Sequence, residues 1–397
     1  MERIIFHIDV NNAFLSWTAV YLLSKGEKLD IRTIPSIIGG DESKRRGVVL
    51  AKSPVAKRYG VKTAETIYSA KKKCPNLKVY APNFELYKIA SDKMYGYLCQ
   101  YTPIIQRYSI DECFIDLTGT KYIYNDYIKL ATKIKEDIKK NFGFTVNVGI
   151  GNNRLCAKMA SDFEKPDKIH TLYNNEIKEK MWPLPIEDLF MVGKKTAEKM
   201  KELNINKIGD LANTDITLLK KHFKNQAQFY KESALGIDNS KVETKHPKSE
   251  SISTTETLPY DYNDKIKLQN VLLHQTDELT RQLREKKLFA QTVGITFKNS
   301  QFEKYSHQTK LEIPTNKTEE IYNIVITLFK KSWKEDAIRN IGIRLGNLTK
   351  TRTEQISIFS MEEEKEEEKV QDIIDSINKK YKSTTITLAS MKEQDNE

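Results

Sequence analysis

Acidic side chains stand inside two of the most apolar stretches of this 397-residue chain, and this feature limits the folds that the chain can adopt. Residues 3–10 read RIIFHIDV, which is apolar on both faces apart from Asp9 and is typical of a central strand covered on both sides. Asp111 and Glu112 interrupt a second strand-like stretch, residues 104–117. Since an unpaired buried carboxylate is costly, we expect cationic groups beside these side chains.

The three carboxylates can share one site only under a geometric condition. Adjacent strand residues point to opposite faces, so Asp111 and Glu112 can reach one ion cluster only near a turn or a strand end. Three buried carboxylates repel each other unless divalent cations screen them, and Mg²⁺ prefers such ligands while leaving positions for phosphate oxygens. The alternative is that Asp9 caps a helix beginning at Asn11 or Asn12, while the other two carboxylates face solvent.

The remaining predicted elements indicate a multidomain α/β (α+β) protein. After the first strand we expect an amphipathic helix, a charged loop at 39–46 and a small mixed segment to about residue 82. Residues 123–163 form a helix-strand-helix unit, and residues 176–235 form a separate set of short helices. The order beyond residue 250 is β-α-β-β-α-β, as in a ferredoxin-like domain, with elements over 251–258, 264–287, 290–298, 305–313, 318–332 and 338–346.

The composition favours a cytoplasmic protein with a polyanionic partner. No apolar run approaches the roughly 20 residues of a membrane span, and acidic Glu2 precedes a strand-like segment, which is unlike a secretory signal. The formal net charge of +11, despite an acidic tail, suits a polyanionic partner such as nucleic acid, and the alternative is a lysine-rich composition that reflects genome bias. Without C-x-x-C pairs or neighbouring histidine pairs, we expect no zinc site and four reduced, half-buried thiols, Cys74, Cys99, Cys113 and Cys156.

Three motifs resemble those of Y-family DNA polymerases, the DinB/UmuC group. IDVNNAF at 8–14 and SIDECFID at 109–116 resemble the two metal-binding motifs of that family. NVGIGNNRLCAKMASD at 147–162, with Lys165 and Pro166, resembles its palm segment. The resemblance implies a template-directed, low-fidelity DNA polymerase that adds deoxynucleotides to a primer 3′ end, past damage, in DNA repair or an SOS-type response.

The same resemblance implies a right-hand polymerase fold and a monomer. The palm has a mixed sheet, the fingers are small, the thumb is helical, and the little finger has the β-α-β-β-α-β order. The implied boundaries are palm 1–24 and 83–173 within a catalytic domain of about 4–187, fingers 25–82, thumb 174–238, linker 239–250, little finger 251–350 and tail 351–397.

The resemblance also assigns residues to the metal ions and to the deoxynucleoside triphosphate. Asp9, Asp111 and Glu112, with the carbonyl of Val10, would hold two Mg²⁺ ions. One ion would lower the pKa of the primer 3′-hydroxyl, and the other would neutralise the triphosphate as pyrophosphate leaves. Phosphate oxygens would meet the backbone N–H groups at a helix N-terminus, those of Asn11, Asn12, Ala13 and Phe14.

Three side chains would complete the nucleotide site. Phe14 would be the sugar gate, whose ring fills the space of a ribose 2′-hydroxyl, or else an ordinary core aromatic. Lys165 and Lys57 would reach the triphosphate as point charges. The segment SPVAK at 53–57 departs from the commoner finger pattern of the family, which has Tyr and Arg there, and looks closer to the UmuC branch.

Two other regions would contact primer-template DNA. LFMVGKKTA at 189–197, followed by IGDL at 208–211, resembles a helix-hairpin-helix, which binds the DNA backbone through N–H groups and lysines; the alternative is a plain helical turn. Alternation in the last strand puts Arg344 outward, either toward a template phosphate or merely into solvent. The candidate DNA-binding residues are Gly193, Lys194, Lys195, Lys298, Arg339 and Arg344.

The tail carries a candidate partner motif. QISIF at 355–359 resembles the peptide by which bacterial polymerases hold the sliding clamp, with Gln355, Ile358 and Phe359 as the contacts; a last strand of the domain is the alternative. A flexible arm of this kind would raise the local concentration of the enzyme on DNA. An acidic run and a short helix near 370–381 follow.

Two other functions remain open. GGDE at 39–42 is similar to a tetrapeptide of diguanylate cyclases, which act on GTP without DNA. Ser43 stands where those enzymes have an aromatic residue, and we expect no strand pair to frame the segment as a hairpin turn. The second alternative is a catalytically silent, DNA-binding accessory protein of a replicase, although all three acidic ligands are present.

Overall fold

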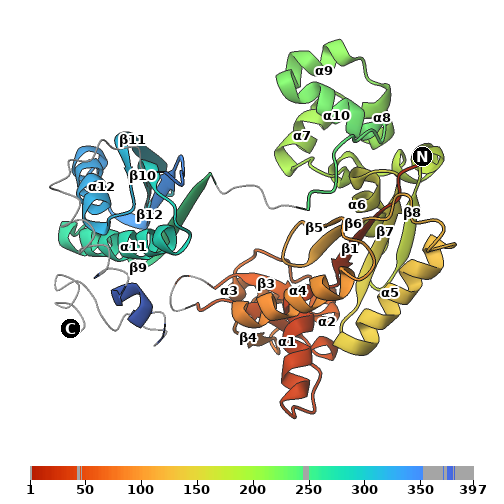
Figure 1. Cartoon of the computed structure of the whole chain (residues 1–397), viewed down its shortest axis with the longest axis horizontal. Coiled ribbons are helices and arrows are strands. Elements are labelled where there is room, and N and C mark those ends of the chain that lie inside the picture. The colour runs from red at the N-terminus through yellow and green to blue at the C-terminus, as the bar shows by residue number, and fades with distance from the viewer. Residues whose placement is uncertain are drawn as a thin grey trace. The chain divides into compact units, whose positions relative to one another are not determined.

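The computed structural model describes residues 2–42, 45, 47–244, 250–351, 370, 373–378 and 380. The chain divides into two compact units, residues 1–41 with 47–246 and residues 42–46 with 247–397 (Figure 1). Each unit has a hydrophobic core of its own.

A five-stranded mixed sheet, with strand order β5-β6-β1-β7-β8, organises the first unit. The central strand β1 pairs antiparallel with β6 and β7, and β8 runs parallel to β7. All residues of β1 and β7 are buried, which confirms the prediction of a central strand covered on both sides. The strands are β1 (Ile5–Val10), β5 (Ile105–Arg107), β6 (Glu112–Asp116), β7 (Val146–Gly151) and β8 (Ile169–Leu172).

One face of this sheet is apolar. Phe6, Ile8 and Val10 of β1 belong to a core that three helices complete. These helices are α1 (Ala13–Ser24), α4 (Phe84–Leu98) and α5 (Tyr127–Phe142).

The opposite face carries the polar side chains of β1 and is covered by α6 (Arg154–Asp162). This helix lies so close to β7 that a Cβ atom on Gly149 would stand 2.0 Å from the carbonyl oxygen of Ala157. Glycine is therefore required on β7 for α6 to approach. The side chains between α6 and β1 are consequently held in a narrow, buried layer.

The second predicted strand, 104–117, is two strands and not one. β5 and β6 are antiparallel neighbours joined by a tight turn, in which the N–H groups of Tyr108 and Ser109 donate to the carbonyl of Glu112 at 2.9 and 3.2 Å. Asp111 thus lies in the turn and Glu112 opens β6. The geometric condition for bringing both carboxylates to one place is met.

A small three-stranded sheet and short helices form the predicted finger region. Its elements are η1 (Ile31–Thr33), β2 (Ser36–Gly39), β3 (Val49–Lys52), α2 (Pro54–Arg58), α3 (Ile67–Lys73) and β4 (Lys78–Tyr80). β2 and β3 pair antiparallel and flank the loop that begins within the GGDE segment. The connection between them is longer than a hairpin turn, because Gly39 pairs with Val49.

Residues 174–234 form the expected set of short helices. They are η2 (Asn174–Glu176), η3 (Ile177–Met181), η4 (Ile186–Asp188), α7 (Lys194–Glu202), α8 (Ile208–Asn213), α9 (Ile216–Phe223), η5 (Lys224–Gln226) and α10 (Ala227–Ala234). Their apolar faces share one core with part of α6 and the end of β8.

The segment after α10 packs on the five-stranded sheet and α6. The amide nitrogen of Asn153 donates to the carbonyl of Gly236 at 2.8 Å, and the N–H of Leu155 donates to the Asp238 carboxylate at 3.0 Å. Val242 is buried in a cluster with Ile5, Phe114 and Ala157. The first part of the predicted linker is thus a fixed strap across the start of α6.

The second unit is an antiparallel sheet of order β11-β10-β12-β9 with two helices. Its elements are β9 (Ser251–Tyr262), α11 (Lys265–Glu285), β10 (Ala290–Asn299), β11 (Lys304–Thr315), α12 (Thr318–Ser332) and β12 (Ile338–Gly346). The predicted β-α-β-β-α-β order is confirmed. The apolar stripe of α11 that faces this sheet is buried at Leu268, Leu272, Leu279 and Leu283.

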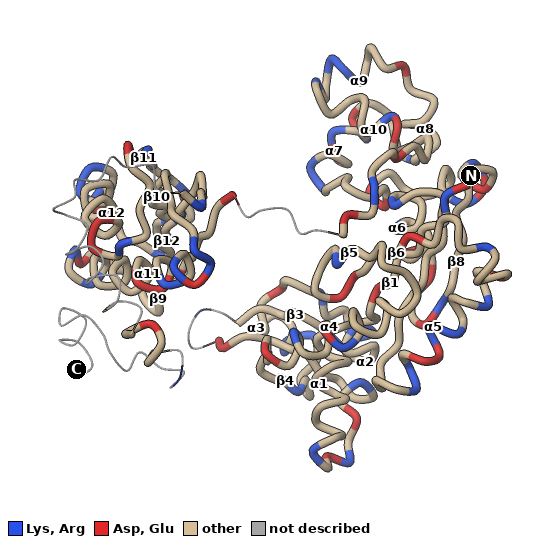
Figure 2. The backbone as a smooth tube through the Cα atoms, viewed as in Figure 1, with Lys and Arg blue, Asp and Glu red and all other residues tan. Residues whose placement is uncertain are grey.

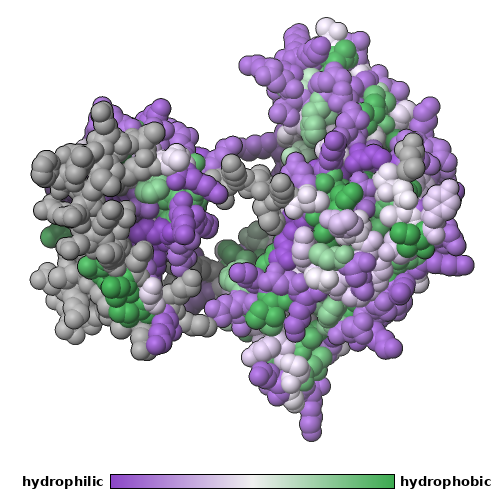
Figure 3. All heavy atoms as spheres, viewed as in Figure 1, coloured by the Kyte–Doolittle hydropathy of each residue, from purple (hydrophilic) through white to green (hydrophobic). Residues whose placement is uncertain are grey.

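Several further expectations can be compared with the described residues. No helix among them is long and apolar enough to cross a membrane, and the surface in view in Figure 3 is largely hydrophilic with scattered apolar patches. Cys74, Cys113 and Cys156 are buried and Cys99 is exposed, so the expectation of half-buried thiols is wrong.

Only part of the tail can be compared. The clamp-binding residues Gln355, Ile358 and Phe359 lie outside the described residues. Residues 370, 373–378 and 380 are helical, as expected, and Asp375 forms an ion pair with Arg284 of α11 at 2.7 Å.

Candidate active site

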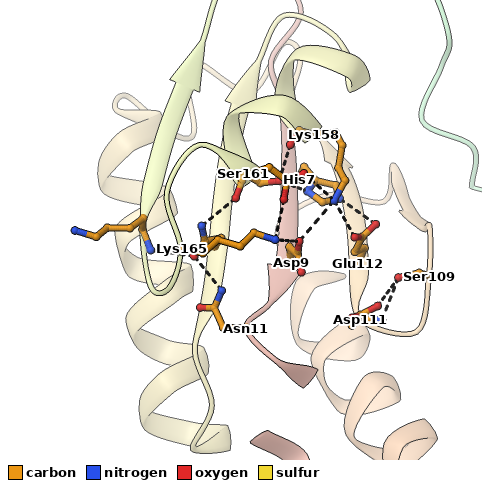
Figure 4. A network of polar contacts seen from close by, with 12 residues as sticks. His7, Asp9, Asn11, Ser109, Asp111, Glu112, Lys158, Ser161 and Lys165 are labelled. Carbon is orange, nitrogen blue, oxygen red and sulfur yellow. Dashed lines mark hydrogen bonds and ion pairs between the residues drawn. The ribbon is translucent and has the colours of Figure 1, made fainter. Parts of the chain in front are cut away.

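The register of β1 and β6 brings the acidic residues to one end of the five-stranded sheet. Asp9 lies directly opposite Glu112, and the N–H of Val10 donates to the carbonyl of Asp111 at 3.1 Å. Residues directly opposite each other on antiparallel strands share a face. The side chains of Asp9 and Glu112 therefore both lie on the α6 side (Figure 4).

Two lysines supply the cationic groups that the sequence predicts beside Asp9. Lys165 donates to Asp9 Oδ2 at 2.6 Å and lies 2.8 Å from Asp162. Lys158 of α6 lies 2.8 Å from Glu112 and 3.6 Å from Asp9. Since one ammonium touches both carboxylates, their oxygens can be no farther apart than these two distances together, within the roughly 8 Å that ligands of a two-ion site span.

His7 lies beside Glu112, and Ser161 holds the His7 ring. His7 is fully buried, its Nδ1 lies 2.8 Å from the Ser161 hydroxyl, and its Nε2 lies 3.5 Å from Glu112. Burial raises the pKa of the Glu112 carboxyl, but the His7 ring and the Lys158 ammonium together lower it to about 2. Lys158, at 2.8 Å, is the stronger partner, because 3.5 Å exceeds an ordinary hydrogen-bond distance.

Asp111 differs from its two neighbours in having no cationic partner within ion-pair distance among the described residues. Its carboxylate accepts a hydrogen bond from the Ser109 hydroxyl at 2.6 Å. Burial raises the pKa of Asp111, and the negative charges of Asp9 and Glu112 add to that rise. No cation of the described residues therefore lies close enough to balance the Asp111 carboxylate.

This donor set fits a divalent metal ion, although the described side chains are not arranged around one. No three His, Cys, Asp or Glu side chains of the described part converge into a metal-binding group. The reason is visible in Figure 4: Asp111 turns toward Ser109, while lysines hold the other two carboxylates. Hard oxygen ligands with excess negative charge are what Mg²⁺ requires. The structure thus brings together two of the three predicted ligands.

The predicted phosphate-binding amides differ in availability. The N–H of Asn11 donates to the carbonyl of Thr145 at 2.9 Å, so it would have to give up this bond to bind phosphate. Asn12 occupies the N-cap position with φ 52°, but its side chain donates to the carbonyl of Lys52 at 2.6 Å and does not cap the helix. The first backbone bond of α1 runs from Ser16 to Asn12, so the N–H groups of Asn12, Ala13 and Phe14 precede it.

Phe14 belongs to an aromatic cluster at the start of α1. Its ring stacks on Tyr87 with centroids 4.6 Å apart and meets Phe84 edge-on at 6.1 Å. It is only partly buried. Packing against the core and a role as sugar gate are thus compatible, since one face of the Phe14 ring can pack on Tyr87 while the other faces the sugar.

Lys57 is exposed in the last turn of α2. Lys52 lies nearer the active site, because its carbonyl holds Asn12. Burial, together with the positive charge of Lys57, lowers the pKa of Lys52. The two lysines therefore form one positive area at the edge of the finger region.

The predicted helix-hairpin-helix residues are exposed together. Gly193 is the N-cap of α7, and Lys194 and Lys195 form its first turn. Lysines also gather on α9, as the blue segments of Figure 2 show. An exposed helix N-terminus with lysines suits a DNA phosphate.

In the second unit, the candidate DNA-binding residues lie on the sheet face that the helices leave open. Arg344 is exposed between buried Ile343 and Leu345, which confirms the predicted alternation. Lys298 pairs across the sheet with Asn340 and with Lys304, so these side chains share that face. A cavity of about 200 Å³ is lined by Thr257, Lys298, Lys304, Arg339 and Asn340.

Several site residues were missed in the sequence. Lys158, Asp162, His7 and Ser161 all take part in the network around Asp9 and Glu112. The sequence holds a signal for His7, which shares a strand face with Asp9. The spacing of four residues between Lys158 and Asp162 indicates only a helix-surface pair.

Comparison with known proteins identifies the family. The impB/mucB/samB family matches residues 8–162, its C-terminal domain matches residues 249–358, and the IMS family HHH motif matches residues 174–205. "DNA polymerase IV" of Clostridium acetobutylicum is 44% identical over 395 residues, covering 100% of both chains. "DNA polymerase IV 2" of Bacillus subtilis is 34% identical over 90% of this chain and 87% of its own.

A solved structure shows the same fold. The Y-family DNA polymerase chimera Dbh-Dpo4(243-245)-Dbh superposes with a TM-score of 0.76 at 22% identity, covering 88% of this chain and 100% of its own. Matches of the family run through both compact units. The chain therefore belongs to the impB/mucB/samB family, and the resemblance to Y-family DNA polymerases that its motifs indicate is confirmed.

Proposed function

We propose that this chain is a DNA-directed DNA polymerase that extends a primer 3′ end by nucleotidyl transfer, with low fidelity and past damaged bases. One observation carries the proposal: the register that sets Asp9 opposite Glu112 and joins Val10 to Asp111 at the end of the central strands. Similarity along the whole chain to proteins named DNA polymerase IV supports it. No observation favours the cyclase or the silent accessory protein.

The reaction is metal-dependent, and we assign two Mg²⁺ ions to Asp9, Asp111, Glu112 and the Val10 carbonyl. When bound, such ions activate the attacking hydroxyl and neutralise phosphate charge. Ser109 holds the Asp111 carboxylate at 2.6 Å, and Lys158 holds that of Glu112 at 2.8 Å. Both carboxylates would exchange these contacts for the ions when the site fills.

The incoming triphosphate lies between the start of α1 and the loop after α6. The N–H groups of Ala13 and Phe14 point from a helix N-terminus, where anions bind. Lys165 leaves Asp9 for the triphosphate, because its side chain is 39% exposed. Lys57, assisted by Lys52, adds positive charge from the fingers.

Primer-template DNA contacts α7 and the open sheet face of the second unit. Both carry lysines or arginines without reading bases, which suits damaged templates. The sliding clamp is held through Gln355, Ile358 and Phe359, as the tail motif predicts.

Primer extension tests the proposal. The full chain should extend a primer in the presence of Mg²⁺, on an undamaged template and past an abasic site. Asp111→Ala and Glu112→Gln should abolish extension, while Glu136→Gln, a substitution of an exposed residue of α5, should not change it. Extension by Asp111→Ala at the parental rate would overturn the site assignment.

Primer extension with and without sliding clamp tests the clamp contact. Addition of sliding clamp should lengthen the products of the parent chain. Replacement of Gln355 and Phe359 by Ala should remove that gain and leave extension without clamp unchanged. Equal stimulation of both chains would exclude the motif.

A further inference from the structure

The ammonium of Lys158 lies at the centre of three carboxylates. It is 2.8 Å from Glu112, 3.3 Å from Asp162 and 3.6 Å from Asp9. Its side chain is only 10% exposed, and it projects from the middle of α6, whose neighbouring residues are buried. Figure 4 shows it between β1 and β6, directly above the carboxylates assigned to metal binding.

Lys158 and Lys165 differ in their freedom to leave. Lys165 lies after the end of α6, its side chain is 39% exposed, and it contacts Asp9 and Asp162 but not Glu112. Lys158 is fixed by a helix that β7 approaches without any intervening side chain at Gly149. If Lys165 moves from Asp9 to a bound triphosphate, Lys158 therefore stays beside Asp9 and Glu112.

A buried positive charge at this point opposes a second cation. Even at an effective dielectric constant near 20, two positive charges a few ångströms apart repel each other appreciably. A divalent ion that binds Asp9 and Glu112 must displace the Lys158 ammonium from Asp9 or tolerate it nearby. Either way, part of the binding free energy of the ion offsets the loss of that contact.

We propose that Lys158 is a positioning residue that acts as a resident cation: it holds Asp9 and Glu112 together in the metal-free chain and weakens their affinity for divalent ions. The inference rests on the metal site of the proposed function. The coupling is reciprocal, so Lys158 destabilises the bound ion by as much as the ion weakens the contacts of Lys158. The residue thus sets the concentration at which the site fills.

The test uses the full chain with Mn²⁺ as the only probe, without DNA or nucleotide. Mn²⁺ binding is measured by electron paramagnetic resonance of the free ion, and thermal unfolding is followed in EDTA and in saturating Mn²⁺. Lys158→Met removes the charge and keeps most of the side-chain volume. It should bind Mn²⁺ about five- to tenfold more tightly. It should also melt below the parent in EDTA, by a gap that narrows in Mn²⁺.

Two variants separate this role from simple loss of an ion pair. Lys135→Met removes a comparably buried lysine, 12% exposed, whose partner Asp167 lies at 2.9 Å outside the acidic cluster. It should lower the melting temperature equally in EDTA and Mn²⁺ and leave Mn²⁺ binding unchanged. Lys158→Gln, which keeps a donor for Glu112, should reproduce the tighter Mn²⁺ binding if Lys158→Met does not fold.

The outcomes distinguish this inference from the function on which it rests. Parental or weaker Mn²⁺ binding by both Lys158 variants, with a melting gap that Mn²⁺ does not narrow, overturns the inference alone. If the parent chain itself neither binds Mn²⁺ nor is stabilised by it, the metal site and the inference both fall.

Discussion

The ring of Phe14 stacks on the ring of Tyr87, with centroids 4.6 Å apart and an interplanar angle of 16°. Tyr87 is fully buried in α4, and its hydroxyl lies 3.1 Å from that of Thr18. The stack therefore fixes the plane of the Phe14 ring, whose other face is only partly covered. Because the ring cannot turn aside, it can exclude a ribose 2′-hydroxyl by steric contact.

Replacement of Phe14 by Ala should remove that exclusion. The clash of an added oxygen with a fixed ring costs about 1–3 kcal/mol, so ribonucleotide incorporation should rise about ten- to a hundredfold relative to deoxynucleotide incorporation. The ratio of kcat/KM for the two nucleotides measures it. Tyr87→Phe, which keeps the stack, is the control and should retain discrimination. Unchanged discrimination in Phe14→Ala would remove the sugar gate from the proposed function.

Lys165→Met should weaken the binding of the incoming nucleotide. Its ammonium is the accessible one of the two that contact Asp9, so it can reach phosphate oxygens. We expect KM for the deoxynucleotide to rise about tenfold, with little effect on primer-template affinity. Lys168→Met, which removes a half-exposed lysine paired with Glu164 at 3.2 Å, is the matched control. A KM equal to that of the control variant would contradict the assignment.

DNA binding should report on the open face of the second unit through its salt dependence. A lysine or arginine that neutralises one phosphate contributes about one unit to the slope of log K against log salt. Arg344→Ala and Lys298→Ala should each reduce that slope by about one. Lys331→Ala should leave the slope unchanged, because this exposed lysine lies at the end of α12 and not on the open sheet face. If both variants keep the slope of the parent chain, neither Arg344 nor Lys298 contacts a DNA phosphate.

The strands that carry the acidic residues could be predicted because their neighbours are apolar, and the second unit because its elements alternate regularly. Helix α4 escaped prediction, since two of its four buried residues, Tyr87 and Ser91, are not simple apolar side chains. The apolar pattern, which Ile110 continues, predicts strand through the turn that precedes Glu112. Lys158 could not be assigned from local sequence, because a lysine on a helix is usually solvated and only the packing of α6 on β7 buries this one.

The four thiols should react at very different rates. Burial raises the pKa of both Cys113 and Cys156 from an ordinary value of 9.0 to about 12, so each is a neutral thiol at pH 8 in the folded chain. Cys99 is exposed. A mild alkylating reagent at pH 8 should therefore label Cys99 first, as peptide mass spectrometry can show, and label Cys113 and Cys156 only in denaturant.

The same pKa shifts predict a pH effect on stability. Because the folded-state pKa is raised, the unfolded chain loses these protons first, and the contribution is complete below pH 9 and is lost as pH rises toward 12. Cys113→Ala should lessen the fall in urea midpoint between pH 9 and 10.5. An equal fall in parent and variant would show that this thiol does not contribute.

The acidic network depends on the close approach of α6 to β7. Two glycine substitutions test this approach, one expected to lower the free energy of unfolding and the other to raise it. A Cβ on Gly149 would stand 2.0 Å from Ala157 O and 2.4 Å from Ser161 N, both backbone atoms of α6, so the helix must shift. Gly149→Ala should cost about 3 kcal/mol of unfolding free energy, because the backbone of α6, which carries Lys158 and Ser161, must move away from β7. Gly96 is an exposed residue of α4, and a Cβ there would have nothing within 4 Å, so Gly96→Ala should instead stabilise by about 0.5–1 kcal/mol. Urea midpoints measure both, and a Gly149→Ala chain as stable as Gly96→Ala would mean that α6 does not lie where the network requires it.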